Sequence, residues 1–341
     1  MKRRLVLMMA AMAAFWFAPG AQAAEKVKAV ASFSILGDMV RQVGGNRVDV
    51  VTLVGPNSDA HVYDPTPADA KTLASSDILF INGLGFEGWM ERLEKSSGFK
   101  GKVVTASDGI TPLDTAEERA HGDEIGEDRD GHAKHEDDHN EHAKHEDHDE
   151  HEDDEEHARH VGHHHGDIDP HAWQDLANGK VYVANIRDGL IAVDPEGKET
   201  YEANAAKYLD AMAKEEAAVK EAIAKLPPER RKIITSHDAF GYFGAAYGLE
   251  IIAPEGVSTE SEASAKDVAK IIRQIKAERI PAVFLENVTD RRLLDQIARE
   301  TGAKIGGTLF SDALSGPDGP APTYLDMFRH NLETLTQALS S

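Results

Sequence analysis

Apolar positions along the chain alternate between two spacings, one typical of buried strands and the other of amphipathic helices. Runs of β-branched and apolar residues at 27–33 and 48–54 indicate strands, and a segment with helical spacing lies between them. Regular alternation of this kind predicts a mainly parallel sheet with helices on both faces. In the first half of the chain we expect strands at 27–33, 48–54, 77–81 and 102–105, and helices at 35–43, from Pro67, at 89–95 and at 179–193.

The same alternation returns after the middle of the chain and continues to the C-terminus. We therefore predict an α/β protein with two lobes, each a mainly parallel sheet flanked by helices. At 341 residues the chain is long enough for each lobe to have a core of its own. In the second half we expect strands at 232–235, 250–253, 282–285 and 304–307, and helices at 239–247, 265–278, 290–301 and 324–339.

A long helical segment separates the two regions of alternation. Residues 196–226 are rich in Ala, Glu and Lys, and Pro227 and Pro228 follow them directly. As one helix this segment would be about 45 Å long, so we interpret it as a rigid connection. The predicted division is an N-terminal lobe at 24–195, a linking helix at 196–226 and a C-terminal lobe at 227–341.

The first residues have the pattern of an export signal. A positive start at 2–4 precedes an apolar run at 5–17, and a small-x-small cleavage site follows at 21–23. The apolar run is too short to span a bilayer comfortably. We therefore predict a signal peptide at 1–23, cleaved near Ala23, and a periplasmic protein.

Charge and cysteine content exclude several classes of partner and site. The formal net charge is −23, which argues against nucleic acid as a partner because phosphate backbones select basic surfaces. The chain has no cysteine, so any metal must be held by imidazole and carboxylate rather than thiolate. The usual lipid attachment point after a signal peptide is also missing, and we expect a freely soluble monomer.

The acidic residues are concentrated in one segment, which is also rich in histidine. Thirteen of the 17 histidines lie between 121 and 165, and residues 132–137 are repeated at 142–147. With so few apolar residues, the segment at 115–167 is predicted to be a disordered loop. Spaced imidazoles and carboxylates can bind additional zinc weakly, and the candidate ligands are His132, His135, His139, His142, His145, His148, His151, His157, His160, His163, His164 and His165.

Four histidines lie outside this segment, and three of them follow predicted strands or precede helices in polar loops. His61 follows the strand at 48–54, His171 precedes a helix, and His237 follows the strand at 232–235, whereas His330 lies within a predicted helix and is interpreted as structural. The carboxyl ends of parallel strands are where ligands bind in open sheets. We therefore expect the three loop histidines to converge.

Asp312 lies in a fourth polar loop, after the strand at 304–307. Three neutral imidazoles and one carboxylate are the number and type of ligands that a tetrahedral zinc site requires. Imidazole-rich sites favour Zn²⁺, Cu²⁺, Ni²⁺ or Co²⁺ over Mn²⁺ and Mg²⁺. Four protein ligands leave no position for an activated water, which favours binding over catalysis. Each residue taken alone could equally be a turn residue or a helix cap.

The segments DAHVYDPTP, DPHAWQD, TSHDAFGYF and LFSDALS resemble the motifs of solute-binding proteins that serve zinc and manganese ABC importers. The resemblance extends from about residue 27 to the C-terminus. It implies that His61, His171, His237 and Asp312 bind the metal in the cleft between the lobes, two from each lobe. The His-rich loop resembles the zinc branch, and the manganese branch typically has Glu in place of His237. Some zinc members have a C-terminal disulfide, which this chain lacks.

This resemblance predicts high-affinity capture of Zn²⁺ and its delivery to an integral-membrane ABC permease. Two alternatives remain open from the sequence. One is a periplasmic zinc buffer or metallochaperone. The other is a zinc hydrolase in which three histidines hold the metal and Asp312 acts as a base. Outside the His-rich segment the chain contains no HExxH, and it has no G-x-S-x-G or P-loop motif, so we predict that it is not an enzyme.

Overall fold

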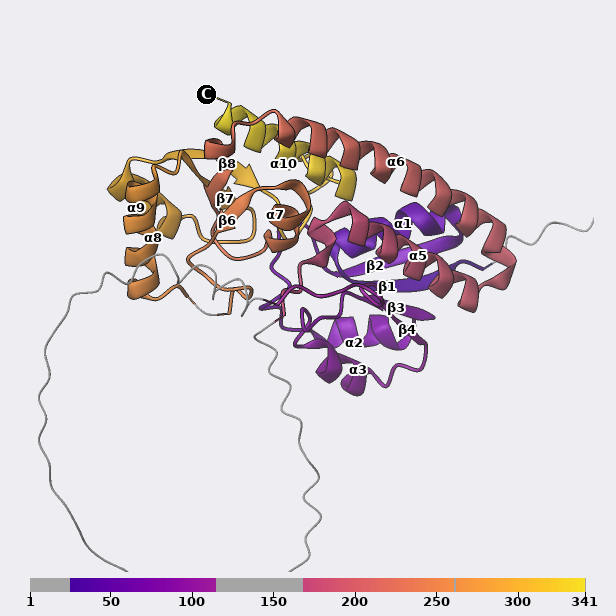
Figure 1. The fold of residues 1–341 in the computed structure, drawn as a ribbon. Helices are drawn as coiled ribbons and strands as arrows, with labels where there is room; N and C mark the ends of the chain where they lie inside the picture. The colour runs from indigo at the N-terminus through magenta and orange to yellow at the C-terminus, as the bar shows by residue number, and fades with distance from the viewer. Residues whose placement is uncertain (1–24, 115–167, 261, 341) are drawn as a thin grey trace, which may run out of the picture.

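The structure, a computed structural model, describes residues 25–114, 168–260 and 262–340. These residues form two α/β lobes, as predicted, and each lobe contains a four-stranded parallel sheet (Figure 1). The predicted signal peptide and the His-rich segment lie outside the described residues. Within the described ranges, no helix is both long enough and apolar enough to cross a membrane.

The N-terminal lobe has a sheet in the order β2-β1-β3-β4. The central strands β1 and β3 are almost fully buried because α1 and α5 cover one face, while α2 and α3 lie on the other side (Figure 1). All its strand pairs are parallel, so their carboxyl ends lie at one edge. The elements are β1 (Val27–Phe33), α1 (Ser34–Gly44), β2 (Val48–Val54), α2 (Pro67–Ala74), β3 (Ile78–Ile81), α3 (Met90–Ser97), β4 (Lys102–Thr105) and α5 (Leu176–Val193).

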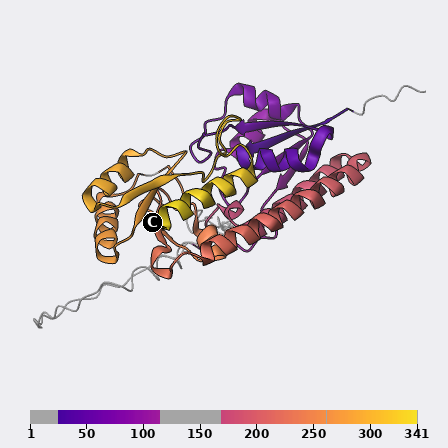
Figure 2. The ribbon, with the colours of Figure 1, turned by 90° about the horizontal axis from the view of Figure 1, so that it is seen from above.

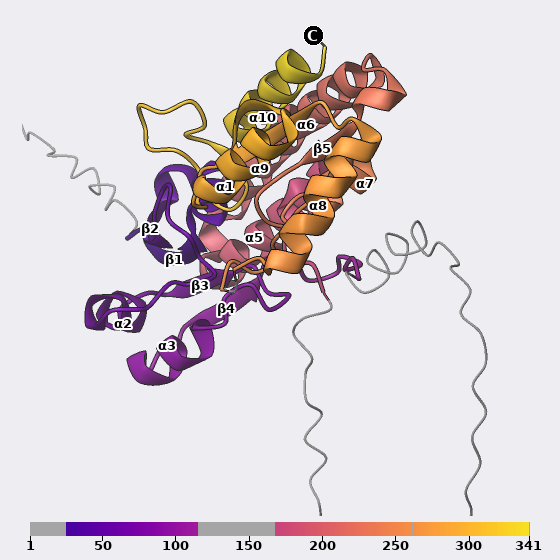
Figure 3. The ribbon, with the colours of Figure 1, turned by 90° about the vertical axis from the view of Figure 1, so that its left-hand side faces the viewer.

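The C-terminal lobe has a sheet in the equivalent order β6-β5-β7-β8. Helices α8 and α9 pack together on the side away from the N-terminal lobe, as Figures 1 and 3 show, and α10 packs along β8. The carboxyl ends of these strands also form one edge of the sheet. The elements are β5 (Lys232–Ile234), α7 (Gly241–Tyr247), β6 (Glu250–Ile252), α8 (Ala265–Glu278), β7 (Ala282–Glu286), α9 (Arg292–Thr301), β8 (Lys304–Leu309) and α10 (Tyr324–Leu339).

The linking helix α6 (Lys198–Ala224) extends along both lobes (Figure 2). It contacts α1 and α5 of the N-terminal lobe and α7 and α10 of the C-terminal lobe. Its buried positions recur at helical spacing and form an apolar stripe toward those helices. They include Tyr201, Tyr208, Met212, Val219 and Ile223. The helix is therefore packed against both lobes along its length, which a free-standing connection would not be.

Apolar packing is continuous between the lobes, in contrast to the expectation of one core for each. One cluster of buried side chains includes residues from β1, α5, α6, α7 and α10. A second, smaller cluster joins the C-terminal sheet to α8 and α9. Because the main core is shared, relative movement of the lobes must preserve most of these contacts.

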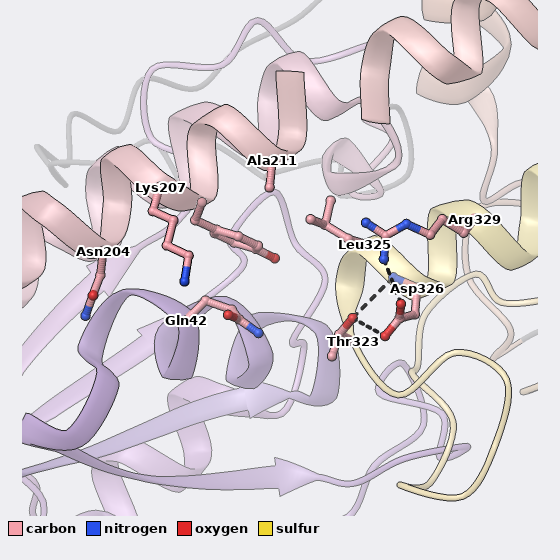
Figure 4. A pocket seen from close by; sticks show the side chains of 9 residues that line it. Gln42, Asn204, Lys207, Ala211, Thr323, Leu325, Asp326 and Arg329 are labelled. Atoms are coloured by element: carbon pink, nitrogen blue, oxygen red, sulfur yellow. Dashed lines mark hydrogen bonds and ion pairs between the residues drawn. The ribbon is translucent and has the colours of Figure 1, made fainter. Parts of the chain in front are cut away.

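A groove of about 260 Å³ lies where α1, α6 and α10 meet (Figure 4). It is lined by polar side chains, among them Gln42, Lys207 and Thr323. Arg329 of α10 reaches Glu215 of α6 at 2.9 Å and so connects the two helices beside it. None of the candidate metal ligands lines this groove.

Candidate metal centre

The structure brings together the four residues that the sequence singles out. His61 lies in the loop after β2, His171 in the loop before α5, His237 in the loop after β5, and Asp312 in the loop after β8. Each offers one ligand atom, and these atoms all lie within 4.8 Å of one another. His171, His237 and Asp312 have no exposed surface, and His61 is 7% exposed.

Several of these ligand atoms are closer than that limit. The Nε2 atoms of His61 and His171 are 3.3 Å apart. Asp312 Oδ2 lies 3.1 Å from His237 Nε2 and 3.4 Å from His61 Nε2, and Asp312 Oδ1 lies 3.5 Å from His171 Nε2. Donors that are each about 2.0–2.1 Å from a tetrahedral Zn²⁺ ion are about 3.3–3.4 Å apart. The cluster therefore has nearly the dimensions of a metal coordination shell.

A carboxylate oxygen in the cluster lacks a hydrogen-bond donor, as expected if it binds a cation. Asp312 Oδ1 is buried and has no hydrogen-bond partner among the described residues. A buried carboxylate oxygen without a donor is costly unless a positive charge lies beside it. A divalent ion held by the four side chains would supply that charge.

Asp169 orients the imidazole of His171. Its Oδ1 atom is 2.7 Å from His171 Nδ1, and the same oxygen accepts the backbone N–H of His171 at 2.9 Å. A carboxylate behind one ring nitrogen places the proton there and leaves the other nitrogen free to bind a metal. The loop is fixed by Asn82, whose side-chain amide donates to Pro170 O at 2.9 Å.

Glu286 has the equivalent place behind His237. Its Oε2 atom lies 2.7 Å from His237 Nδ1, and its side chain is fully buried. Its Oε1 atom accepts the backbone N–H groups of Ser236 and His237, at 2.7 and 2.9 Å. Two of the three imidazoles are thus backed by a buried carboxylate.

The loop that carries His61 is held by contacts from both lobes. Asp59 accepts the backbone N–H of His61 at 2.8 Å, and its other oxygen accepts the hydroxyl of Thr259, a residue of the C-terminal lobe, at 2.6 Å. Trp89 donates its indole N–H to Ala60 O at 2.8 Å. These bonds position the imidazole of His61 within the cluster.

Close charges determine the protonation of the cluster. Burial lowers the pKa of the His237 imidazole, but the carboxylates of Glu286 and Asp312 outweigh it and raise that pKa well above its usual value. Burial likewise raises the pKa of the Asp312 carboxyl, and the facing imidazoles of His237 and His171 outweigh it and hold that pKa well below its usual range. The pair therefore favours an ionised carboxylate, which is the form that binds a metal.

The loop that carries Asp312 is hydrogen-bonded to both lobes. Ser311 O accepts the indole N–H of Trp173 at 3.0 Å and the amide of Gln174 at 2.8 Å. Leu314 donates its backbone N–H to Ser34 Oγ at 2.9 Å, and its carbonyl accepts the backbone N–H of Asn57 at 2.9 Å. From its own lobe, Asn331 bonds to the backbone of Phe310 and Asn287 donates to Ala313 O at 3.1 Å, so the loop joins the two lobes.

Sequence reasoning did not identify Asp169 and Glu286. Asp169 lies two residues before His171, and Glu286 is the last residue of β7, directly after the predicted strand at 282–285. An acidic residue at the carboxyl end of a buried parallel strand is a signal that could have found Glu286. His330 lies outside the cluster, as expected, with Nε2 3.0 Å from Thr308 O.

Comparison with known proteins identifies the family of this chain. Residues 29–338 match the family described as zinc-uptake complex component A, periplasmic. The chain is 30% identical to the manganese-binding lipoprotein MntA of Halalkalibacterium halodurans, over 93% of this chain and 89% of the relative. It is also 30% identical to the iron-binding protein YfeA of Yersinia pestis, over 92% and 86%. The periplasmic zinc-binding protein TroA of Treponema pallidum superposes with a TM-score of 0.74 at 26% identity, covering 92% and 99%.

The two-lobed fold and the buried donor cluster define a periplasmic metal-binding protein that serves as the substrate-binding component of an ABC importer. The chain belongs to the family of the periplasmic zinc-uptake component A. Similar proteins are named for manganese, iron and zinc, so membership of the family leaves the choice of metal open.

Proposed function

We propose that the protein captures Zn²⁺ in the periplasm and delivers it to the membrane permease of an ABC importer. The ion is the cargo, and His61, His171, His237 and Asp312 are its ligands. The observation that carries the proposal is the convergence of three imidazole nitrogens and one carboxylate within 4.8 Å. Buried carboxylates behind two of the imidazoles support the same role.

The ligand types favour zinc over the metals named for several relatives. Mn²⁺ is a harder ion that prefers oxygen ligands, whereas imidazole suits Zn²⁺. His237 supplies a third imidazole where a carboxylate would favour manganese. Cu²⁺ would bind imidazole at least as tightly, so the choice between copper and zinc depends on supply and geometry.

Binding rather than hydrolysis is supported by the number of protein ligands. A catalytic zinc site has three protein ligands and an open position for water, whereas four fill a tetrahedral shell. If the protein is a binder, bound Co²⁺ should show the intense visible absorption of a tetrahedral site with four protein ligands. Three ligands and a water would instead support a hydrolase.

The contacts of the ligands suggest how the ion is released. His171 is oriented by Asp169 of the N-terminal lobe and His237 by Glu286 of the C-terminal lobe, whereas the loops of His61 and Asp312 are bonded to both lobes. A small relative tilt of the lobes would therefore separate His237 from His171. Contact with the permease could induce such a tilt, and the ion would then be held more weakly.

Competitive metal titration tests this proposal. Apo protein should bind Zn²⁺ in preference to Mn²⁺, and His237→Ala should weaken the tight site by roughly 100-fold or more. His330→Ala is the matched control, since this histidine lies outside the cluster, and should leave the affinity unchanged. Preference for Mn²⁺, or wild-type affinity in His237→Ala, would contradict the proposal.

We also propose that the segment at 115–167 binds additional zinc through the twelve histidines named above. The two described residues that flank it, Asp114 and Ile168, form an antiparallel bridge. Ile168 lies three residues before His171, so the segment joins the described structure close to the tight site. Deleting 115–166 should lower the zinc stoichiometry and leave one tight site, and an unchanged stoichiometry would contradict this role.

Location and transport can be tested in cells. We propose that residues 1–23 are removed on export and that the mature protein is a monomer. We also propose that its lobes comprise 24–195 and 227–341, joined by the helical segment at 196–226. N-terminal sequencing of the periplasmic protein should begin near Ala24. A deletion strain should grow poorly when zinc is limiting and recover with excess zinc, whereas a zinc buffer would not be needed for uptake.

A further inference from the structure

The carboxylate of Glu286 has two oxygens with two different tasks. Its Oε1 atom accepts two backbone N–H groups, from Ser236 and His237, and these fix the orientation of the carboxylate. Its Oε2 atom lies 2.7 Å from His237 Nδ1. Among the described residues neither Oε2 nor Nδ1 has another hydrogen-bond partner.

Two electronegative atoms at this separation must share a proton. Since an ionised carboxylate can only accept, the proton belongs to Nδ1 of the imidazole. When a metal ion displaces the proton on Nε2, that atom presents its lone pair to the ion, and it is the atom that lies 3.1 Å from Asp312 Oδ2 within the donor cluster. The opposite tautomer would direct an N–H at the metal position.

We propose that Glu286 is a positioning residue that selects the metal-binding tautomer of His237. The inference rests on the proposed function, because it assigns a role within the same site. Glu286 does not touch the ion, and it acts by keeping the proton of His237 on the nitrogen away from it.

Replacement by glutamine makes this role testable. In Glu286→Gln the amide oxygen must remain at the position of Oε1, because two backbone N–H groups point at it. The amide NH₂ group then faces His237 Nδ1 and donates to it. This donation forces the proton of the imidazole onto Nε2, where it blocks the lone pair that the metal needs.

Glu215 supplies a control for the loss of a largely buried carboxylate outside the site. Its Oε2 atom lies 2.9 Å from Arg329 Nε, where α6 meets α10, beside a groove that none of the candidate metal ligands lines. Glu215→Gln removes one negative charge, as Glu286→Gln does, but it leaves the hydrogen bonds of His237 in place.

The experiment compares the two variants in the full chain, with zinc affinity measured by competition with a chelator. Glu286→Gln should bind Zn²⁺ about 10- to 100-fold more weakly, whereas Glu215→Gln should stay within about threefold of wild type. With Co²⁺, Glu286→Gln should also lose part of the tetrahedral absorption. Wild-type affinity in Glu286→Gln, or an equal loss in both variants, would overturn the inference.

A second measurement tests the tautomer of His237 in wild-type protein, so it does not depend on whether Glu286→Gln folds. In zinc-bound wild-type protein labelled with ¹⁵N-histidine, the signals absent from His237→Ala belong to His237. They should show a protonated Nδ1 and a metal-bound Nε2, and the reverse assignment would overturn the inference. If wild-type protein itself fails to bind zinc tightly, the proposed function fails. If it binds and only these results differ, the role of Glu286 alone fails.

Discussion

At the scale of single residues, the site depends on burying opposite charges together. Asp312 and His237 are both fully buried, and each would be destabilised there without the other. Against the opposing effect of burial, Glu286 and then Asp312 raise the pKa of the imidazole, and His237 and then His171 lower the pKa of the Asp312 carboxyl. A divalent ion replaces the proton in this arrangement, so metal binding and proton release are coupled.

Glu286, which lies behind His237, also determines which substitutions would change the preferred metal from Zn²⁺ to Mn²⁺. His237→Glu supplies the oxygen ligand that Mn²⁺ prefers, but it places a second carboxylate beside the buried Glu286. We expect the single variant to bind both metals weakly because like charges repel. Adding Glu286→Gln should remove the repulsion and give a donor to the new carboxylate, so the double variant should favour Mn²⁺ over Zn²⁺.

Competitive titration of the two metals against the wild type and both variants measures this effect. His330→Glu serves as the control for an added carboxylate outside the site. Equal preference for Mn²⁺ over Zn²⁺ in the single and double variants would show that Glu286 does not limit the change of metal preference.

The four clustered residues could be predicted from sequence because each lies in a polar loop at the edge of a predicted sheet. The residues that orient them could not, since a buried acidic side chain is identified by what it contacts. Glu286 meets the backbone at Ser236, fifty positions earlier in the chain, and Asp59 meets Thr259 across the two lobes. Spacing along a sequence does not report such contacts.

At the scale of elements, the order and type of strands and helices follow from the hydrophobic pattern, and their boundaries follow from caps. Helix α5 starts at Leu176, three residues before the prediction, because Asp175 accepts the backbone N–H of Ala177 and caps it. Helix α6 starts at Lys198, two residues after the predicted beginning of the segment, because Pro195–Gly197 forms a 3₁₀ turn. Pattern fixes the body of a helix better than its ends.

The turn between α5 and α6 depends on one carboxylate. Asp194 accepts two hydrogen bonds from Arg47, at 2.8 and 2.9 Å, and one from the hydroxyl of Tyr201 at 2.6 Å. The hydrogen bonds from Arg47 lower the pKa of the Asp194 carboxyl most, and the one from Tyr201 lowers it further. Because the pKa is lowered on folding, the stabilisation is present above the unfolded value of about 4 and is lost as the pH falls through the folded value.

Asp194→Asn should therefore lower the free energy of unfolding by about 1–2 kcal/mol near pH 7. The difference from wild type should stay constant between about pH 5 and 8 and shrink below about pH 4, as measured by urea unfolding at each pH. Asp188→Asn is the control, since Asp188 is exposed and pairs only with its neighbour Arg187 among the described contacts. A difference that grows toward low pH would contradict this account.

At the scale of the whole molecule, the shared core and α6 restrict how the lobes move. One apolar cluster extends through both lobes, and α6 packs against helices from each. The sequence predicted a long connecting helix but could not show that it packs along both lobes. Large hinge opening would expose part of this core to water, which costs roughly 25 cal/mol for each Å² of apolar surface. A small tilt is therefore the expected motion.

Distance measurements between spin labels test the size of this motion. The chain has no native cysteine, so labels can be attached cleanly at Lys71→Cys in α2 and Arg299→Cys in α9, both exposed positions on opposite lobes. Adding zinc should narrow the distance distribution and shift its centre by only a few ångströms. A shift comparable to the width of a lobe would show hinge closure and contradict the role assigned to α6.

The most direct test of the central claim is X-ray absorption at the zinc edge, on protein that lacks 115–166 and carries one equivalent of Zn²⁺. We predict a four-coordinate ion with three imidazole nitrogens and a carboxylate oxygen, at about 2.0–2.2 Å. In His237→Ala one imidazole should be lost. Two or fewer imidazoles in the wild-type protein, or a six-coordinate shell of oxygens, would contradict this prediction.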